Sequence, residues 1–438
     1  MSCDPRRLAR REVGCAPGAA FRAAVASCRR RGLALCGAAQ FERAAPRGVG
    51  VLCLELDTAE QRLLLAGAAD GSVSFFDTAA AGLDGASAPP GPPRSVCAAL
   101  RLPRGTAHAH GVAAAAWYPA GGGLAFTAGL DGAIKGWDLG AGGAEALRFT
   151  AGAKVYALAL PPAAGAPHGL LAAGAGDGRV LLCDPAAGGA AHALTGHRAA
   201  VLSAAWLPGC EHVLLTGGAD GAVRLWDVRT AGTLLLLDQH RSATAARGSG
   251  VGGDVSDAAA ASGGGTLSGA ATAHTGAVTC VRASHDGRLV YTHGGDGRVR
   301  AWCAARGVNL LLHFPGAATP NAARLGTRLA LSADGRALYA PARAGAQPLC
   351  ALSGAPLGPP LAGGHFGAVV ACVAHPHSGA LFTAAHDGAV LTWTPRAARP
   401  AADADGDEGG RGALPAGAQE DADAWSDDDE AGRGPRMG

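Results

Sequence analysis

The sequence contains few lysines, few aromatic residues and almost no net charge. Only two lysines occur, Lys135 and Lys154, and aromatic residues make up 5% of the chain. The formal net charge is +2, so the protein has no overall field that would attract nucleic acid or an anionic membrane. No apolar run approaches the roughly 18–20 residues of a membrane-spanning helix, and the arginine-rich N-terminus lacks the apolar core of a secretory signal. We therefore expect neither membrane association nor direct sequence-specific binding of nucleic acid.

The cysteines show neither the pairing nor the spacing of a disulfide or metal framework. There are twelve, with no Cys-x-x-Cys pair, and several lie in strand-like runs (Cys53, Cys183, Cys280, Cys372). Disulfide frameworks belong to much smaller secreted chains, and structural zinc sites need closer ligand spacing. We expect reduced, mostly buried thiols, as in the cytosol or nucleus, and no metal or other cofactor.

A dipeptide repeat dominates the rest of the sequence. Aspartate followed by glycine, a strong signal for a tight turn between strands, recurs before short strand-like runs. The aspartates stand at Asp70, Asp131, Asp177, Asp220, Asp296 and Asp387, with successive gaps of 61, 46, 43, 76 and 91 residues. The last gap is about two repeats of ~40–45 residues, and the gap of 76 is one repeat with an insertion.

Four of these repeats share further residues at nearly constant offsets. A histidine precedes the aspartate by 21–23 residues, a threonine precedes it by four, and a tryptophan follows it by six. The predicted sets are His110–Thr127–Asp131–Trp137, His197–Thr216–Asp220–Trp226, His274–Thr292–Asp296–Trp302 and His365–Thr383–Asp387–Trp393.

This constellation resembles the structural tetrad of WD40 repeat proteins. In that family the four side chains form a buried hydrogen-bonded chain, and their N–H and O–H groups can satisfy the aspartate, which must be hydrogen-bonded when buried. Catalysis or metal binding by these residues is the alternative. It is disfavoured, because a site repeated in four places around a ring cannot converge on one substrate.

The repeat count predicts an all-β, seven-bladed WD40 β-propeller over residues 33–396. Blade 1 has Asp70 and Phe76 but no matching histidine or threonine, and blade 3 has Cys183 in the tryptophan position. Strand-like runs within 324–361 indicate a sixth blade without a tetrad. Residues 33–41, with Leu33, Leu35 and Phe41, could supply the outer strand of blade 7 and so protect the last sheet edge.

Three segments fall outside the predicted ring. Residues 1–32 are basic, and Phe21, Val25 and Cys28 recur at helical spacing before Gly32, a plausible helix stop; the segment is either a solvated leader or a helix that docks on a partner. Residues 241–272 read as a flexible insertion rich in Ser, Gly and Ala. Residues 397–438 form an acidic tail, with Trp425 as its only aromatic residue, that cannot bury enough surface to fold alone.

The fourth repeat carries a more specific resemblance. Trp226-Asp227-Val228-Arg229 resembles the docking box of substrate receptors for cullin-4 ubiquitin ligases. Trp117-Tyr118-Pro119, Leu237–His240, Gly364-His365-Phe366 and Asp423–Ser426 are similar, in the same order, to segments of the Cockayne syndrome group A family. The resemblance extends from about residue 33 into the tail and is strongest over 193–240.

The resemblance implies a nuclear, non-catalytic receptor in transcription-coupled nucleotide excision repair. Implied partners are the DNA-damage-binding adaptor of the cullin-4 ligase, the Cockayne syndrome group B ATPase and the stalled RNA polymerase II complex. Trp226, Asp227 and Arg229, with the helix around Phe21 and Val25, would contact the adaptor. The alternatives are that Asp227 and Arg229 only cap their strand, that the chain is a generic WD40 scaffold in another nuclear or cytosolic complex, or that it is a propeller enzyme. An enzyme would need unpaired, convergent catalytic groups, whereas the sequence offers repeated tetrads.

Overall fold

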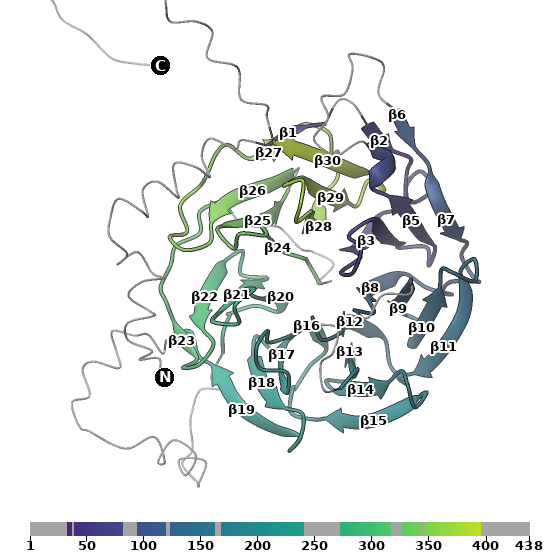
Figure 1. Ribbon diagram of the computed structural model, residues 1–438. Coiled ribbons are helices and arrows are strands. Elements are labelled where there is room, and N and C mark those ends of the chain that lie inside the picture. Colours follow the sequence, from purple (N-terminus) through teal and green to yellow (C-terminus); the bar gives the residue numbers. More distant parts are fainter. Residues whose placement is uncertain are drawn as a thin grey trace, which may run out of the picture. The chain divides into compact units, whose positions relative to one another are not determined.

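The computed structural model describes residues 33–36, 39–81, 94–119, 123–162, 168–240, 272–316, 326–343 and 345–395. These form seven four-stranded antiparallel sheets around a common centre, which confirms the predicted seven-bladed propeller (Figure 1). The expected N-terminal helix, most of the predicted insertion and the acidic tail lie outside the described residues.

The blades follow one another along the chain. In order, blade 1 is β3 (Val51–Leu56), β4 (Leu63–Ala68), β5 (Val73–Asp77) and β7 (Ala98–Leu102); blade 2 is β8 (Val112–Trp117), β9 (Leu124–Gly129), β10 (Ala133–Asp138) and β11 (Ala144–Thr150); blade 3 is β12 (Val155–Ala159), β13 (Leu171–Ala175), β14 (Val180–Asp184) and β15 (Gly189–Leu194); blade 4 is β16 (Val201–Trp206), β17 (Val213–Gly218), β18 (Val223–Asp227) and β19 (Gly232–Leu237).

The remaining blades complete the ring. Blade 5 is β20 (Val278–Ala283), β21 (Leu289–Gly294), β22 (Val299–Cys303) and β23 (Val308–Asn309); blade 6 is β24 (Ala330–Leu331), β25 (Ala337–Ala342), β26 (Gly345–Cys350) and β27 (Leu361–Ala362); blade 7 is β28 (Val369–Ala374), β29 (Leu381–Ala385), β30 (Val390–Pro395) and β1 (Leu33–Leu35). Outside the blades are β2 (Ala39–Phe41), β6 (Arg94–Val96) and the 3-10 turn η1 (Ala79–Ala81).

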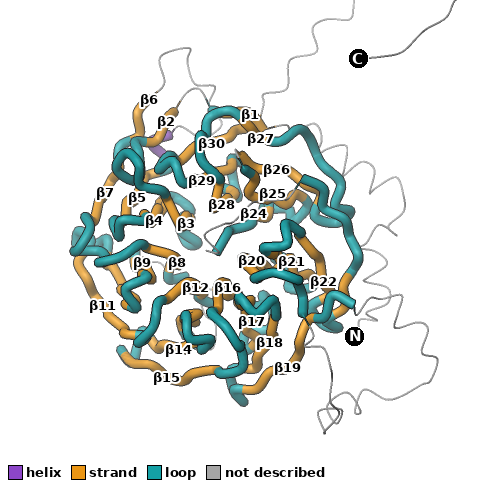
Figure 2. Tube along the Cα trace, turned by 180° about the vertical axis from the view of Figure 1, so that it is seen from behind, coloured by secondary structure: helices purple, strands orange, loops and turns teal. Residues whose placement is uncertain are grey.

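The alternation of strand direction gives the ring two distinct faces. The connection that enters each first strand and the turn between the second and third strands lie at one face, which carries Asp131, Asp220, Asp296 and Asp387 and is called the Asp-turn face. The turns between first and second strands and between third and fourth strands lie at the other, called the Arg229 face. Figure 2 shows the ring from behind, with the strands of each blade stacked from the centre outward.

Closure of the ring is partly as predicted. Leu33, Ala34 and Leu35 pair antiparallel with Pro395, Thr394 and Trp393 of β30, so the start of the described chain is the outer strand of blade 7. The expected strand does not continue to Phe41, because β2 leaves the sheet and pairs in parallel with β6 of the segment before β7. Phe41 instead faces the space between blades 7 and 1.

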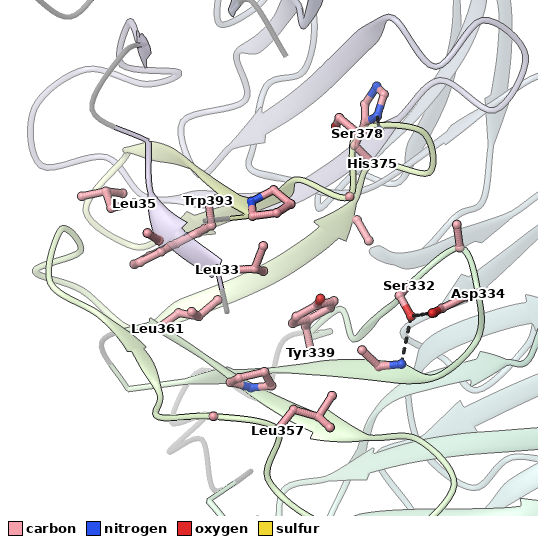
Figure 3. Close-up of a pocket in the computed structure, with 18 of the residues that line it drawn as sticks. Leu33, Leu35, Ser332, Asp334, Tyr339, Leu357, Leu361, His375, Ser378 and Trp393 are labelled. Carbon is pink, nitrogen blue, oxygen red and sulfur yellow. Dashed lines mark hydrogen bonds between the residues drawn. The ribbon is translucent and has the colours of Figure 1, made fainter. Parts of the chain in front are cut away.

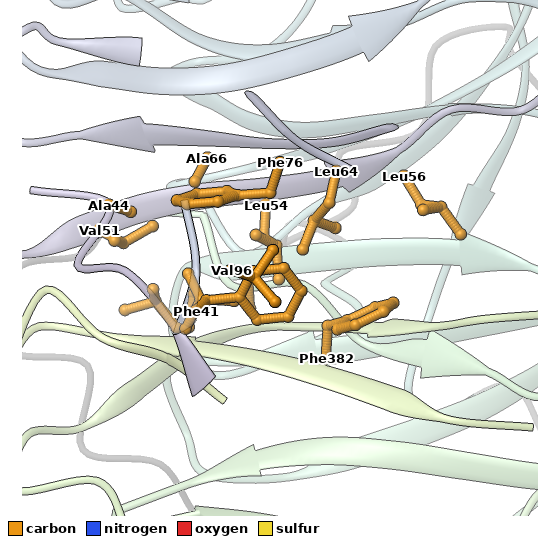
Figure 4. Close-up of a cluster of buried hydrophobic side chains, with 14 of the residues drawn as sticks. Phe41, Ala44, Val51, Leu54, Leu56, Leu64, Ala66, Phe76, Val96 and Phe382 are labelled. Carbon is orange, nitrogen blue, oxygen red and sulfur yellow. The ribbon is translucent and has the colours of Figure 1, made fainter. Parts of the chain in front are cut away.

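The blades are held together by apolar clusters at their seams. At the seam between blades 7 and 1, the ring of Phe41 packs edge-on against Phe76 and Phe382, with centroids 5.3 and 5.8 Å away (Figure 4). Phe76 comes from blade 1 and Phe382 from blade 7, so one side chain that precedes the first blade bridges both. Aromatic pairs in this geometry add roughly 0.5–1.5 kcal/mol beyond their burial.

A polar tie crosses the centre of the ring. Arg328, beside the innermost strand of blade 6, donates to Glu55 Oε2 of blade 1 at 2.7 Å and to the carbonyl of Ala115 in blade 2 at 3.3 Å. These blades lie two and three places away around the ring, so the guanidinium joins sheets that share no seam with blade 6. Only a long side chain with several donors could make both contacts.

The buried thiols have the protonated character expected of reduced cysteines. Cys53, Cys183, Cys280 and Cys372 are free and buried. Burial raises the pKa of Cys53 and of Cys183 to about 11. Among the described residues, no helix has the length and apolar character required to cross a bilayer.

Candidate functional site: the two faces of the propeller

The tetrad of blade 4 is a continuous chain of hydrogen bonds from the Asp-turn face into the sheet. His197 Nδ1 lies 3.1 Å from both carboxylate oxygens of Asp220, and His197 Nε2 lies 2.8 Å from Thr216 Oγ1. Trp226 Nε1 donates to the same Thr216 oxygen at 2.7 Å. Because the ionised carboxylate can only accept, Nδ1 carries the proton; in that tautomer Nε2 accepts from the threonine hydroxyl, which in turn accepts from the indole N–H. The chain thus fixes one tautomer and satisfies each of its members.

The same chain recurs in blades 2, 5 and 7. Its histidine Nε2–threonine distances are 2.9, 2.7 and 2.8 Å, and its tryptophan–threonine distances are 2.8, 2.9 and 2.9 Å. In every case the aspartate also accepts a backbone N–H two residues ahead, at the tight turn. In blades 2, 4 and 7 it accepts the N–H of the residue after the histidine as well.

One tetrad histidine was predicted wrongly. In blade 2 the histidine is His108, whose Nδ1 lies 3.1 Å from the Asp131 carboxylate, and not His110, which is exposed. The spacing from His108 to Asp131 is 23 residues, as from His197 to Asp220, whereas His110 gives 21. The spacing is 22 residues in blades 5 and 7, so the loop length varies, and the burial of His108 and the exposure of His110 identify the tetrad member.

The tetrad carboxylates remain ionised in the fold. Burial raises the pKa of Asp220, but hydrogen bonds from His197 and from the backbone N–H groups outweigh it and lower the pKa to about 2. The same balance lowers the pKa of Asp131, Asp296 and Asp387. Burial lowers the pKa of His108, His274 and His365, so these imidazoles favour the neutral form that the hydrogen-bond chain requires.

Two predicted degenerate repeats keep the turn without the tetrad. Asp70 of blade 1 accepts hydrogen bonds from the backbone and hydroxyl of Ser72. Asp177 of blade 3 accepts from the backbone and guanidinium of Arg179 and lies beside no histidine in the described contacts. The aspartate is therefore a turn residue in each of these blades, and the histidine and tryptophan add the link between turn and sheet.

The Arg229 face carries a bonded aspartate–arginine pair at the end of β18. Arg229 donates through Nε to Asp227 Oδ1 at 3.0 Å and through Nη2 to Oδ2 at 2.7 Å, and its backbone N–H donates to Oδ1. These bonds lower the pKa of Asp227 to about 2. The Arg229 side chain is 64% exposed, and the pair uses two of its five N–H donors. Arg229 therefore caps its strand locally and still offers three donors to another chain.

Trp226 cannot contact an adaptor as predicted. Its side chain is buried and its indole donates to Thr216 inside blade 4. The tryptophan and the aspartate of the box point in different directions, because successive residues of a strand face opposite sides of the sheet. Trp226 is thus a tetrad member that positions the following Asp227 and Arg229.

The structure places two histidines that carry no sequence signal, His168 and His212, on the Arg229 face with ring centroids 5.5 Å apart. The carbonyl of His212 accepts the N–H of Val228, next to Arg229. His168, from the preceding blade, bonds the carbonyl of Glu211 at 2.6 Å, and its ring lies 4.7 Å from that of Trp206. The two histidines are far apart in the sequence, so only the fold brings them together at the seam of blades 3 and 4.

The Asp-turn face carries an exposed aromatic side chain on a rigid loop. Phe366, in the segment that resembles the Cockayne syndrome group A family, is 100% exposed, whereas every other phenylalanine and tryptophan of the described chain is buried. Its N–H donates to Asp387 Oδ2 at 2.9 Å, so the tetrad of blade 7 fixes the backbone that presents the ring. The predicted docking residues Phe21 and Val25 lie outside the described residues.

The tetrads predict that alanine substitutions at two turn aspartates, one with a tetrad and one without, differ in their effect on the free energy of unfolding. Asp220→Ala leaves His197 and the adjacent N–H groups without their acceptor, and we expect it to lower the free energy of unfolding by roughly 1–3 kcal/mol per buried group left unsatisfied. Asp177→Ala in blade 3 is the matched control and should cost much less, because its partner Arg179 is solvated. Chemical denaturation of the three proteins measures this, and equal losses for both variants would contradict a stabilising tetrad.

Comparisons with known proteins agree with this geometry. A model of the WD domain, G-beta repeat, matches residues 189–227 and 265–303, which end at the tryptophan strands of blades 4 and 5. The chain is 31% identical over 396 residues to the WD repeat-containing protein ATCSA-1 of Arabidopsis thaliana, covering 80% of this chain and 86% of that protein. It is 33% identical over 193 residues to the ribosome biogenesis protein ytm1 of Neurospora crassa, covering 40% and 39% of the two chains. It is also 33% identical over 146 residues to the ribosome biogenesis protein WDR12 homolog of Chlamydomonas reinhardtii, covering 32% of each. The chain therefore belongs to the WD40 repeat family of β-propeller proteins.

Proposed function

We propose that this protein is a non-catalytic substrate receptor of a cullin-4 RING ubiquitin ligase. In this role it recruits partners of stalled transcription for ubiquitylation in transcription-coupled nucleotide excision repair in the nucleus. The observation that carries the proposal is Arg229, which is held rigidly by Asp227 on one face with three unused donors. Similarity to ATCSA-1 along most of both chains supports the same role.

The two faces suit a receptor that joins two partners. A propeller that positions a target without reacting with it needs one surface for the ligase and another for the target. The Arg229 face would meet the DNA-damage-binding adaptor. The Asp-turn face, where Phe366 is exposed, would remain free for the Cockayne syndrome group B ATPase and the stalled RNA polymerase II complex. Exposed aromatic residues on rigid backbone are typical anchors of protein interfaces.

A second candidate function is a WD40 scaffold in another complex. The matches to ribosome biogenesis proteins favour it, although they cover only about a third to two fifths of this chain. The two functions differ in the adaptor, which only the receptor binds.

The receptor function predicts that adaptor binding depends on Arg229. Arg229→Ala should weaken binding of the purified adaptor at least ten-fold, since a hydrogen bond to a charged group contributes roughly 1.5–3 kcal/mol. Asp227→Ala should weaken adaptor binding less than Arg229→Ala, because the variant keeps the Arg229 guanidinium and removes only the carboxylate that holds it. Titration of each variant against the adaptor by calorimetry measures the effect.

Blade 1 supplies the matched control. Arg62 and Asp77 form a similar exposed pair on the same face, three blades away, with Nη2 2.6 Å from the carboxylate. Arg62→Ala should leave adaptor affinity within two-fold of the unaltered protein. Equal affinity of the Arg229 and Arg62 variants would remove the docking role of Arg229 and favour the scaffold function.

The lysine content predicts where the ligase can modify its own receptor. Lys135 is only 6% exposed, and its ammonium group donates to the carbonyl of Thr106 and pairs with Glu145. Lys154 is exposed, and its ammonium group makes no hydrogen bond or ion pair within the described part of the chain. In a reconstituted ligase, Lys154→Arg should therefore abolish lysine-linked self-ubiquitylation, and Lys135→Arg should leave it unchanged. Peptide mapping by mass spectrometry separates these sites from the N-terminal amine, and persistent lysine-linked product in the Lys154 variant would contradict the prediction.

A further inference from the structure

A groove lies between blades 6 and 7 in the described part of the chain. It has a volume of about 800 Å³. One wall is the strand β1 with Leu33 and Leu35; the other is the segment that leads into β27, with Leu357 and Leu361 (Figure 3). Tyr339 lines its floor. We call this cavity the β1 groove.

The groove opens on the Arg229 face. Its rim is formed by the turn between β24 and β25, the turn between β28 and β29, and the connection from β26 to β27. All three connections lie at the end of the blades that also carries Arg229. The groove exists because blade 6 ends in an outer strand of only two residues, so its sheet does not cover the side of blade 7.

The groove exposes leucine and proline side chains, which proteins normally bury. Leu35 is 43% exposed, and Leu33, Leu357 and the prolines at 359 and 360 add apolar surface beside it. Concave sites of roughly this volume that are lined in part by apolar side chains are typical of binding sites. The lining contains no arginine or lysine, and Asp334 is its only carboxylate; His375 and His377 also line it.

The chain itself provides an occupant of matching chemistry. Leu33, the first described residue, forms part of the wall, and 32 residues precede it. Cys28 is five residues before Leu33, which corresponds to at most about 18 Å of extended chain. Phe21, Val25 and Cys28 repeat at the spacing of one helix face, and arginines flank them. These residues lie outside the described part of the structure.

From this we infer that the apolar face of Phe21, Val25 and Cys28 occupies the β1 groove of the same chain when no partner is bound. Asp334 at the rim has a charge opposite to that of the flanking arginines. The segment preceding β1 is thereby held on the Arg229 face. An adaptor then meets a composite surface of propeller and N-terminal segment, and it binds Phe21 and Val25 only by displacing them from the groove.

The position of the segment can be measured directly in the isolated full-length protein. A photo-crosslinking benzoylphenylalanine placed at Val25 should form intramolecular crosslinks to peptides containing 33–36, 357–362 or 374–379, identified by mass spectrometry. Crosslinks to other blades would overturn the inference. Crosslinks that appear only between two chains, with a yield that rises with concentration, would assign the groove to a second copy and would also overturn it.

A pair of charge-matched variants tests whether the apolar face makes the contact. Phe21→Asp with Val25→Asp should raise hydrogen exchange of the amides in 33–36 and 357–362 at least ten-fold. Ala23→Asp with Ser27→Asp introduces the same charge at the same spacing on the opposite side of the helical repeat and should change exchange less than two-fold. Equal exchange in both double variants would contradict the docking. Both experiments omit the adaptor, so their failure leaves the proposed function to be tested separately.

Discussion

The structure depends on the need to satisfy a buried carboxylate. Each tetrad aspartate accepts backbone N–H groups of its own turn and, through the histidine, is connected to a threonine and a tryptophan in the sheet. An unpaired carboxylate in this position would be costly, so the turn, the entry loop and the second and third strands form together or not at all. The carboxylate on one side of the imidazole and the hydroxyl on the other give each ring nitrogen its own partner, which makes the link directional.

This constraint explains how a sequence with few aromatic residues and many alanines builds a large ring. The four tryptophans of the tetrads are buried at the third strand of their blades, and buried alanines occupy much of the first two strands of blade 2. Between blades 7 and 1, Phe41 adds an aromatic contact to both neighbours from outside the blades. Because stability resides in the seams and tetrads, both faces remain free for residues such as Arg229 and Phe366.

Much of this architecture was predictable because its signals are local and periodic. The Asp-Gly turns and the threonine and tryptophan offsets lie within one hairpin, so their spacing is fixed by strand length. The histidine lies across a loop of variable length, and for that reason the sequence does not separate His110 from the correct His108. The closing strand was predicted to extend to residue 41, but it ends at Leu35. The apolar pattern could not show this, because Phe41 is buried in either position. The predicted contact of Trp226 with the adaptor is wrong because adjacent residues of a strand face opposite sides of the sheet, so Trp226 and Asp227 cannot both face a partner.

Other features had no signal in the sequence. Arg328 and Glu55 are 273 residues apart and meet only because the ring brings blades 6 and 1 to a common centre. His168 and His212 meet at the seam of blades 3 and 4 for the same reason. The β1 groove follows from the shortness of β27, which no residue pattern indicates. Long-range contacts of this kind require the closed ring before they can be recognised.

Nuclear magnetic resonance of the histidine rings tests the tetrad account most directly. With selectively ¹⁵N-labelled histidine, the account predicts that His108, His197, His274 and His365 carry the proton on Nδ1 and exchange it slowly with water. His110 should behave as a solvent-exposed imidazole. A slowly exchanging Nδ1 proton on His110, with His108 averaging between tautomers, would contradict the arrangement on which the structure depends.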